Sequence, residues 1–401
     1  MGSLFATPSR GKEIFLFEYD SMWLKTQHSQ ILDPHLRLFA GPQYAKSDHA
    51  NFGLFLDSSP DRWGRVLMKR REEQRAREEK RASRPLMESD YLLGVFDGHR
   101  MGALRFKLDL DGAFLDNDAE MASPPWTKLR DLEHASLQLE KDGAEKDKNY
   151  MNWLKLLVAP GGSLGGARPK ASVVDENGEL WIAKFPSKND EFNIGAWEFL
   201  VHKLAVLAKI DIADAQIKRF TGKHDTFLTK RFDRKDKKRI HFASAMTLLD
   251  RKDGEGADEG VSYLDLVDFL IQNGSQVEKD LQELWRRIVF NICVSNVDDH
   301  LRNHGFILTA KGWRLAPAYD LNPSEAGDGL MLNVSKNDNS QSLDLILEVA
   351  EYFRLKKSKA EAILAEVIGA VLQWRKLADK LVLPKEVARM RHAFRVAEAT
   401  R

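Results

Sequence analysis

The chain has 401 residues, of which 43% are hydrophobic and 30% are charged, which is the balance of a soluble globular protein large enough for more than one packed unit. Its 61 basic and 60 acidic residues nearly cancel, so the basic footprint of a protein that binds DNA by itself is missing. A single cysteine, Cys293, excludes an internal disulfide and a thiolate metal cluster. With no apolar run of about 18 residues and no signal-peptide pattern, the sequence predicts a cytoplasmic protein without a membrane partner.

The first part of the chain is predicted to contain a strand, a long helix and a hairpin. Residues 12–19 form the strand. Ser59-Pro60-Asp61 has the chemistry of a helix start, and the helix is predicted to continue to Arg84 with charges spaced for i,i+4 pairs. Residues 102–118 alternate around Asp111-Gly112, which predicts a hairpin.

The middle of the chain is predicted to alternate strands with a helix. Residues 171–185 form a hairpin with Asn177-Gly178 at its turn. Apolar side chains recur at helical spacing over 193–208, and residues 224–232 form a further strand.

The pattern after about residue 241 is mostly helical. An amphipathic helix is predicted over 281–294, a short hairpin over 304–316 and a helical tail over 343–398. Strands therefore concentrate before residue 235 and helices after it, which predicts an α+β arrangement in lobes.

A glycine-rich segment, Gly-Gly-Ser-Leu-Gly-Gly, occupies residues 161–166 directly before a predicted strand. Glycines let backbone amides approach phosphate oxygens without interference from a Cβ atom. The segment is not a Walker A motif, because no Gly-Lys-Ser/Thr follows. Taken singly, it is equally compatible with a flexible surface loop.

Lys184 lies within an apolar strand, where burial of an unpaired ammonium group is costly. In kinases a lysine at such a place neutralises the α- and β-phosphates of ATP. The alternative is that Lys184 faces solvent on an edge strand.

Asp298 and Asn303 lie in one short loop after the helix over 281–294. Phosphoryl transfer needs a carboxylate that orients the attacking hydroxyl and an amide oxygen on Mg²⁺, and these two residues fit the two roles. Asp320, after the following hairpin, could supply a second Mg²⁺ ligand. Plain polar turns remain the alternative for each. The glycine-rich segment, Lys184, this loop and Asp320 together have the chain order of an ATP-dependent phosphotransferase.

These motifs resemble the HipA family of bacterial toxin serine/threonine kinases, which belong to type II toxin–antitoxin systems, and the resemblance covers most of the chain. It is carried by Phe-Gly-Leu-Phe at 52–55, Pro-Asp-Arg-Trp-Gly-Arg at 60–65, the glycine-rich segment with its lysine at 163–170, Lys-Arg-Phe-Asp-Arg at 230–234, Asp-Asp-His-Leu-Arg-Asn at 298–303 and Leu-Ala-Pro-Ala-Tyr-Asp at 315–320. Ordinary protein kinases place His-Arg before the catalytic aspartate and Asp-Phe-Gly after it. The Asp-x-His-x-x-Asn order is shared with phosphatidylinositol-type lipid kinases, but the other motifs favour HipA.

The resemblance implies an α+β, two-lobed kinase-like fold. Residues 1–120 would form a HipA-type N-terminal subdomain, residues 121–232 a β-rich N-lobe, and residues 233–401 a helical C-lobe with a phosphatidylinositol-kinase-like catalytic loop.

The resemblance also implies a role for individual residues. Asp298 would be catalytic, Asn303 and Asp320 would bind the metal, Ser163 would be an autophosphorylation site, and the 230–234 segment would be a hinge that holds adenine. The residues implied to contact the cofactors ATP and Mg²⁺ are Ser163, Gly165, Gly166, Lys170, Lys184, Lys230, Phe232, His300, Asn303 and Asp320.

The implied partners are a HipB-like helix-turn-helix antitoxin and a protein substrate, with an aminoacyl-tRNA synthetase as the expected one, whose modification arrests growth. Operator DNA would be bound only through the antitoxin complex. Two other functions stay open: a lipid or small-metabolite kinase of the same fold, and an antitoxin-binding co-repressor whose kinase activity is secondary or lost.

Overall fold

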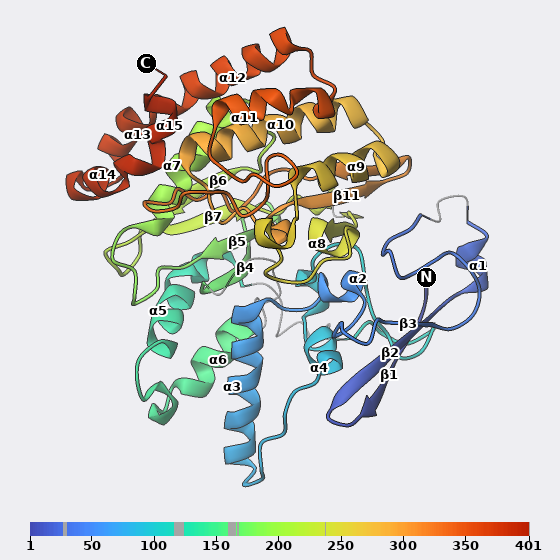
Figure 1. Cartoon of the computed structure of the whole chain (residues 1–401). Coiled ribbons are helices and arrows are strands. Elements are labelled where there is room, and N and C mark those ends of the chain that lie inside the picture. Colours follow the sequence, from blue (N-terminus) through green and yellow to red (C-terminus); the bar gives the residue numbers. More distant parts are fainter. Residues whose placement is uncertain (27–29, 116–123, 159–165, 167, 237, 401) are drawn as a thin grey trace. The chain divides into compact units, whose positions relative to one another are not determined.

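The computed structural model describes residues 1–26, 30–115, 124–158, 166, 168–236 and 238–400 (Figure 1). The chain forms two compact units. Unit 1 contains Met1–Asn189 and Asp233–Ala243, and unit 2 contains Asp190–Phe232 and Ser244–Arg401. The three-part division with boundaries near residues 120 and 232 stays a prediction.

An antiparallel sheet with the strand order β1-β2-β3 begins unit 1. Its strands are β1 (Gly2–Ser9), β2 (Lys12–Tyr19) and β3 (Gln43–Tyr44), and the short helix α1 (Ser21–Leu24) follows β2. Alternate residues of β2, Phe15, Phe17 and Tyr19, are buried. The predicted strand over 12–19 is confirmed. Strand β1 is an addition to the predicted elements, because most of its residues are exposed and lack the alternation that marks a half-buried strand.

The long helix α3 (Arg62–Glu78) lies between the short helices α2 (Gly53–Leu56) and α4 (Glu88–Leu93). As predicted, Asp61 caps its start, and its carboxylate accepts the Gly64 N–H at 2.9 Å. The helix ends earlier than the predicted Arg84, because Lys80 adopts a left-handed conformation and the Arg81 N–H bonds back to Ala76.

The hairpin predicted over 102–118 is wrong for the described part of that range, since residues 102–115 contain a turn but no strand. The Gly112 N–H bonds to Asp109 and the Leu115 N–H bonds to Phe106, so the two arms do approach each other. The Arg105 guanidinium lies 3.3 Å from the Phe114 ring centroid and also binds Asp97. Side-chain contacts therefore hold this turn in place of a β ladder.

The remaining elements of unit 1 are η1 (Asp97–His99), η3 (Trp126–Lys128), α5 (Leu129–Leu139), η4 (Ala144–Lys146), α6 (Tyr150–Val158), β4 (Lys170–Val174), β5 (Leu180–Lys184), β8 (Arg234–Lys235) and β9 (Lys238–Arg239). Strands β4 and β5 form the hairpin predicted over 171–185, in a register that places Lys170 opposite Lys184. Gly178 at its turn has a φ of +78°, which explains the glycine there.

Unit 2 begins with helix α7 (Ile194–Leu207), followed by the antiparallel strands β6 (Ala215–Lys218) and β7 (Thr226–Lys230). These elements confirm the helix predicted over 193–208 and the strand predicted over 224–232. The start of α7 is held by Glu386 from the far end of the chain. Its carboxylate accepts the Asn193 N–H and the Trp197 indole N–H, both at 3.2 Å.

Helix α10 (Val277–Val294) lies at the centre of the helical part of unit 2, in contact with α9, α12 and α15 (Figure 1). Its apolar stripe is fully buried, which confirms the amphipathic helix predicted over 281–294. The hairpin predicted over 304–316 is β11 (Gly305–Thr309) with β12 (Gly312–Leu315). The other elements after residue 241 are β10 (Phe242–Ser244), α8 (Ala245–Leu248), η5 (Ala257–Glu259), α9 (Tyr263–Asn273), η6 (Leu301–Asn303), α11 (Leu343–Glu348), η7 (Ala350–Phe353), α12 (Lys357–Val371), α13 (Trp374–Leu381), α14 (Pro384–Met390), η8 (Arg391–Phe394) and α15 (Arg395–Glu398).

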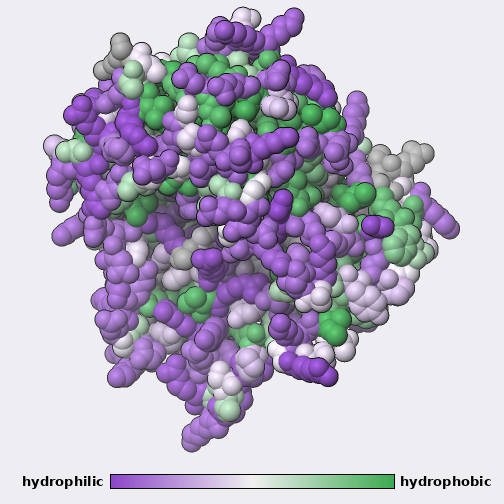
Figure 2. All heavy atoms as spheres, viewed as in Figure 1, coloured by the Kyte–Doolittle hydropathy of each residue, from purple (hydrophilic) through white to green (hydrophobic). Residues whose placement is uncertain are grey.

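Polar side chains cover much of the face shown in Figure 2, with smaller apolar clusters between them. None of the described helices combines the length and the apolar character needed to cross a bilayer.

Candidate active site

The loop that carries Asp298 begins where α10 ends. Ser295 adopts a left-handed conformation with a φ of 48°, which stops the helix and turns the chain into the loop. The Asp298 carbonyl accepts the His300 N–H and the Asn303 Nδ2–H, both at 3.0 Å. These bonds close the loop through the backbone of Asp298 and leave its exposed side chain outside the turn. Among the described residues, no group donates a hydrogen bond to the Asp298 carboxylate.

The amide oxygen of Asn303 stands out among the polar atoms of the described residues. The side chain is buried, and because its Nδ2 donates to the Asp298 carbonyl, the orientation of the amide is fixed. Its Oδ1 then has no hydrogen-bond partner among the described residues. A buried carbonyl oxygen normally finds a donor or a cation, so this atom is suited to bind a metal ion.

Asp320 lies at a strained position in the segment after β12. Its φ of +57° is unusual for a residue with a side chain, and Asn322 Nδ2 donates to Asp320 Oδ1 at 3.0 Å. Burial raises the pKa of Asp298, the neighbouring His300 lowers it, and the like charge of Asp320 raises it again, so that the net shift is upward.

Two contacts connect the Asp320 segment with other predicted site residues. The Tyr319 hydroxyl donates at 2.7 Å to the carbonyl of Arg302, in the loop that carries Asp298. The Tyr319 ring also stacks on Phe232, the residue predicted to lie in the hinge, with ring centroids 5.7 Å apart. Lys230 ends strand β7 two residues earlier. Unit 2 thus brings Lys230 and Phe232 of the predicted hinge, the loop with Asp298 and the segment with Asp320 into one region.

The donor set in unit 2 fits Mg²⁺. Asn303 Oδ1 and the Asp320 carboxylate are oxygen ligands, and Mg²⁺ in nucleotide sites takes only one or two carboxylates and completes its shell with water and phosphate oxygens. Within the described ranges, no group of three or more His, Cys, Asp or Glu side chains could hold a metal ion by itself. The arrangement suits a cation that binds together with a nucleotide.

The other predicted ATP contacts belong to unit 1. Ser163 and Gly165 lie outside the described residues. Lys170 is only 2% exposed, and its Nζ lies 3.0 Å from the Asp61 carboxylate and 3.3 Å from the Gly166 carbonyl. Lys184 is half-buried opposite Lys170, so it is not the freely exposed lysine of the alternative interpretation.

Two features of the site are missing from the sequence-based prediction. Asp61 is predicted as a helix start and belongs to one of the motifs that resemble HipA, but its distance of 109 residues from Lys170 gives no local signal of the ion pair. Asp299, next to Asp298, is fully buried. Burial raises the pKa of Asp299, but His304 and the Tyr263 hydroxyl lower it, and the net shift is downward. The doubled Asp298-Asp299 was the only available hint.

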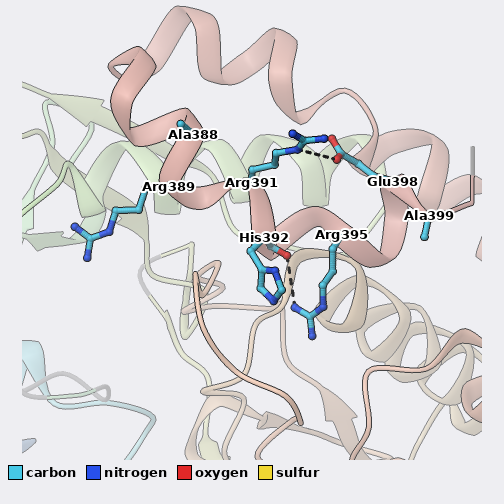
Figure 3. Close-up of a pocket in the computed structure, with 7 residues that line it drawn as sticks. All are labelled: Ala388, Arg389, Arg391, His392, Arg395, Glu398 and Ala399. Atoms are coloured by element: carbon cyan, nitrogen blue, oxygen red, sulfur yellow. Dashed lines mark hydrogen bonds and ion pairs between the residues drawn. The ribbon is translucent and has the colours of Figure 1, made fainter.

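A hollow of about 590 Å³ lies at the C-terminal helices of unit 2 (Figure 3). Its lining comes from α14, η8 and α15 and includes none of the predicted site residues. Arg389 binds Glu191 and Glu325, and Arg391 lies 3.7 Å from Glu398. Because carboxylates compensate two of its three arginines, we do not place the active site there.

The curated relatives that the chain matches are kinases, and it spans about half of their length or less. A putative kinase of Haemophilus influenzae is 28% identical over 179 residues, which are 40% of this chain and 52% of that protein. The serine/threonine-protein kinase toxin HipA of Shewanella oneidensis is 27% identical over 143 residues, which are 31% of this chain and 33% of that protein.

A solved structure supports the fold over the whole chain. HipA from Shewanella oneidensis, determined with HipB and its operator DNA, superposes with a TM-score of 0.65 at 19% identity and covers 99% of this chain and 93% of that one. The predicted α+β kinase-like fold is confirmed. Residues 162–375, more than half of the chain, match the family model of the HipA-like C-terminal domain. The chain therefore belongs to the HipA family.

Proposed function

We propose that this protein is an ATP-dependent kinase that transfers the γ-phosphate to a serine or threonine hydroxyl of a protein. One observation carries the proposal: the exposed carboxylate of Asp298 lies in the same short loop as the amide oxygen of Asn303, and neither has a hydrogen-bond partner among the described residues. The first group can accept a proton and the second can hold a metal ion, and phosphoryl transfer requires both.

Each residue has a defined part in this chemistry. Asp298 would orient the substrate hydroxyl and accept its proton, and its upward-shifted pKa makes it a better base than an ordinary aspartate. Asn303 and Asp320 would hold Mg²⁺, which neutralises phosphate charge when it is bound. His300, which the family resemblance implies to contact ATP, lies in the same loop between Asp298 and Asn303. In unit 1, Gly166, Lys170 and Lys184 would face the phosphates, and the backbone from Lys230 to Phe232 would hold adenine.

The partners follow from family membership and from charge. The structurally similar HipA of Shewanella oneidensis was determined with HipB and operator DNA, which supports a HipB-like antitoxin as the partner of this protein. The balance of 61 basic and 60 acidic residues supports DNA binding only through that complex. We further propose a cytoplasmic toxin that phosphorylates an aminoacyl-tRNA synthetase and thereby arrests growth.

The isosteric variant Asp298→Asn tests the function. Phosphate transfer to a protein substrate should fall by about 10²- to 10⁴-fold, because a general base is lost. Affinity for Mg²⁺ with a non-hydrolysable ATP analogue, measured by calorimetry, should change little. Asp268→Asn, at an exposed aspartate on α9, is the matched control and should keep full activity.

The alternatives predict different results. Full activity of Asp298→Asn would refute the assignment of the base. Transfer to lipids or metabolites but not to proteins would identify a different kinase of the same fold. Nucleotide binding without any phosphate transfer by the wild type would favour an antitoxin-binding co-repressor.

A further inference from the structure

A line of buried polar side chains lies behind the catalytic loop, and the proposed chemistry does not use it directly. Its members are Asp299, Asn291 and Asn296, each at most 2% exposed. One end adjoins Asp298 through the peptide bond to Asp299, and the other end reaches the segment that carries Asp320. All of these residues belong to unit 2.

Asp299 is a fixed end of this line. A single oxygen of its carboxylate, Oδ2, accepts from the Tyr263 hydroxyl at 2.7 Å, from Asn291 Nδ2 at 2.5 Å and from His304 Nε2 at 2.9 Å. Three donors on one buried carboxylate satisfy the charge and leave little freedom of movement. The backbone directly after Asp298 is thereby fixed to α9, to α10 and to the residue that precedes β11.

The line continues from Asn291 to the metal-ligand segment. Asn296 Nδ2 donates to Asn291 Oδ1 at 3.1 Å. The Asn322 backbone N–H donates to Asn296 Oδ1 at 3.3 Å, and Asn322 Nδ2 donates to Asp320 Oδ1 at 3.0 Å. The side chain of Asn296 therefore bridges the catalytic-loop side and the Asp320 side of this line.

The direction of every bond in the line is determined. From Asn322 through Asn296 and Asn291, each residue donates to the next, and the last donor reaches the Asp299 carboxylate. Turning either asparagine amide around would place oxygen against oxygen or nitrogen against nitrogen, so neither can flip. Aligned buried hydrogen bonds polarise one another and stiffen the segments that they join.

We propose that Asn291 and Asn296 are positioning residues that set the separation between the Asp298 carboxylate and Asp320, and with it the geometry of the Mg²⁺ site. The inference rests on the proposed kinase function. Asp320 needs such support because its left-handed backbone is strained and must be imposed by its surroundings. A purely structural role for the asparagines would stabilise the fold without tuning the metal site.

Two variants and one control separate these roles. Asn296→Ala removes both bonds of the bridge. Asn322→Ala removes the side-chain hydrogen bond to Asp320 and keeps the hydrogen bond from the backbone N–H of residue 322 to Asn296. Because the Asn322 side chain is half-buried, we expect this variant to stay folded. As the control, Asn273→Ala removes an exposed asparagine whose side chain donates to the Phe269 carbonyl of its own helix.

The readout is Mn²⁺ affinity measured by electron paramagnetic resonance with a non-hydrolysable ATP analogue, so that no turnover is needed. Both test variants should bind Mn²⁺ about 10- to 100-fold more weakly than the wild type, the range for loss of a group that orients a metal ligand. Metal-free nucleotide affinity should change less than about threefold, and kcat should fall while KM for the protein substrate stays nearly constant. Asn273→Ala should match the wild type in all three.

Unchanged Mn²⁺ affinity in folded Asn322→Ala would overturn the inference, whatever happens to Asn296→Ala. A lower unfolding temperature with unchanged metal affinity would also overturn it and leave only a structural role. Failure of the proposed function would give a different result. The wild type would bind Mn²⁺ and nucleotide but transfer no phosphate, while the two variants would still bind Mn²⁺ more weakly. That result would support the positioning role and refute the kinase activity.

Discussion

The buried ion pair between Asp61 and Lys170 predicts a large effect from a single isosteric change. Each side chain is 2% exposed, and Lys170 Nζ lies 3.0 Å from Asp61 Oδ2. Asp61→Asn keeps the shape of the side chain and its helix cap, because asparagine caps a helix as well as aspartate does. It removes the charge, and the Gly166 carbonyl at 3.3 Å then remains as the other described acceptor of the ammonium.

Removing one partner of a buried pair costs about 3–5 kcal/mol, because the other charge stays buried without compensation. The ammonium group of Lys170 would be in that position in Asp61→Asn. Removing both charges together avoids this cost, because no buried charge then lacks a partner.

The assay is urea unfolding of the wild type and of Asp61→Asn. We expect the free energy of unfolding to fall by about 3–5 kcal/mol in the variant. The double variant Asp61→Asn/Lys170→Met, which removes both charges, should recover most of the deficit. A deficit below about 1 kcal/mol, or a deficit of the same size in the double variant, would refute the reasoning.

Three further predictions concern the site and its partners. Asp320→Asn should weaken Mg²⁺ binding with the ATP analogue by at least about 10-fold in calorimetry, as expected for loss of a metal ligand, and an unchanged metal requirement would contradict its assignment. Ser163 should carry phosphate in the wild type but not in Asp298→Ala, as seen by mass spectrometry. The phosphorylated fraction should lose ATP binding through charge repulsion, and undiminished affinity would exclude that mechanism. Operator DNA should bind at physiological salt only when the antitoxin is added, and tight binding by this chain alone in fluorescence anisotropy would contradict the argument from its charge balance.

Local signals in the sequence predicted most of the elements around the site. The apolar stripes of α7 and α10 have helical spacing, and the glycines at 178 and 312 mark turns where φ is positive. Strand β1 was not predicted because its mostly exposed residues show no alternation, and the turn near Gly112 is held by side-chain contacts in place of a ladder. Pairing of strands depends on residues outside the local pattern.

The candidate site shows the same limit. Asp298 and Asn303 share one loop, so their spacing in the sequence is enough to suggest a common function. The role of Asp299 could not be inferred in this way, because its three donors come from three different parts of the chain. The pairing of Asp61 with Lys170 likewise depends on tertiary structure alone.

The contact between Glu386 and the start of α7 affects how this protein can be divided for experiments. The segment that matches the family model ends at residue 375, eleven positions before the carboxylate that holds the Asn193 N–H and the Trp197 indole. A recombinant fragment cut at the limits of the match would leave both buried donors without their acceptor, at about 1–3 kcal/mol each. The matched segment is thus shorter than the piece of chain that can be expected to fold, and biochemical work on unit 2 should keep its last helices.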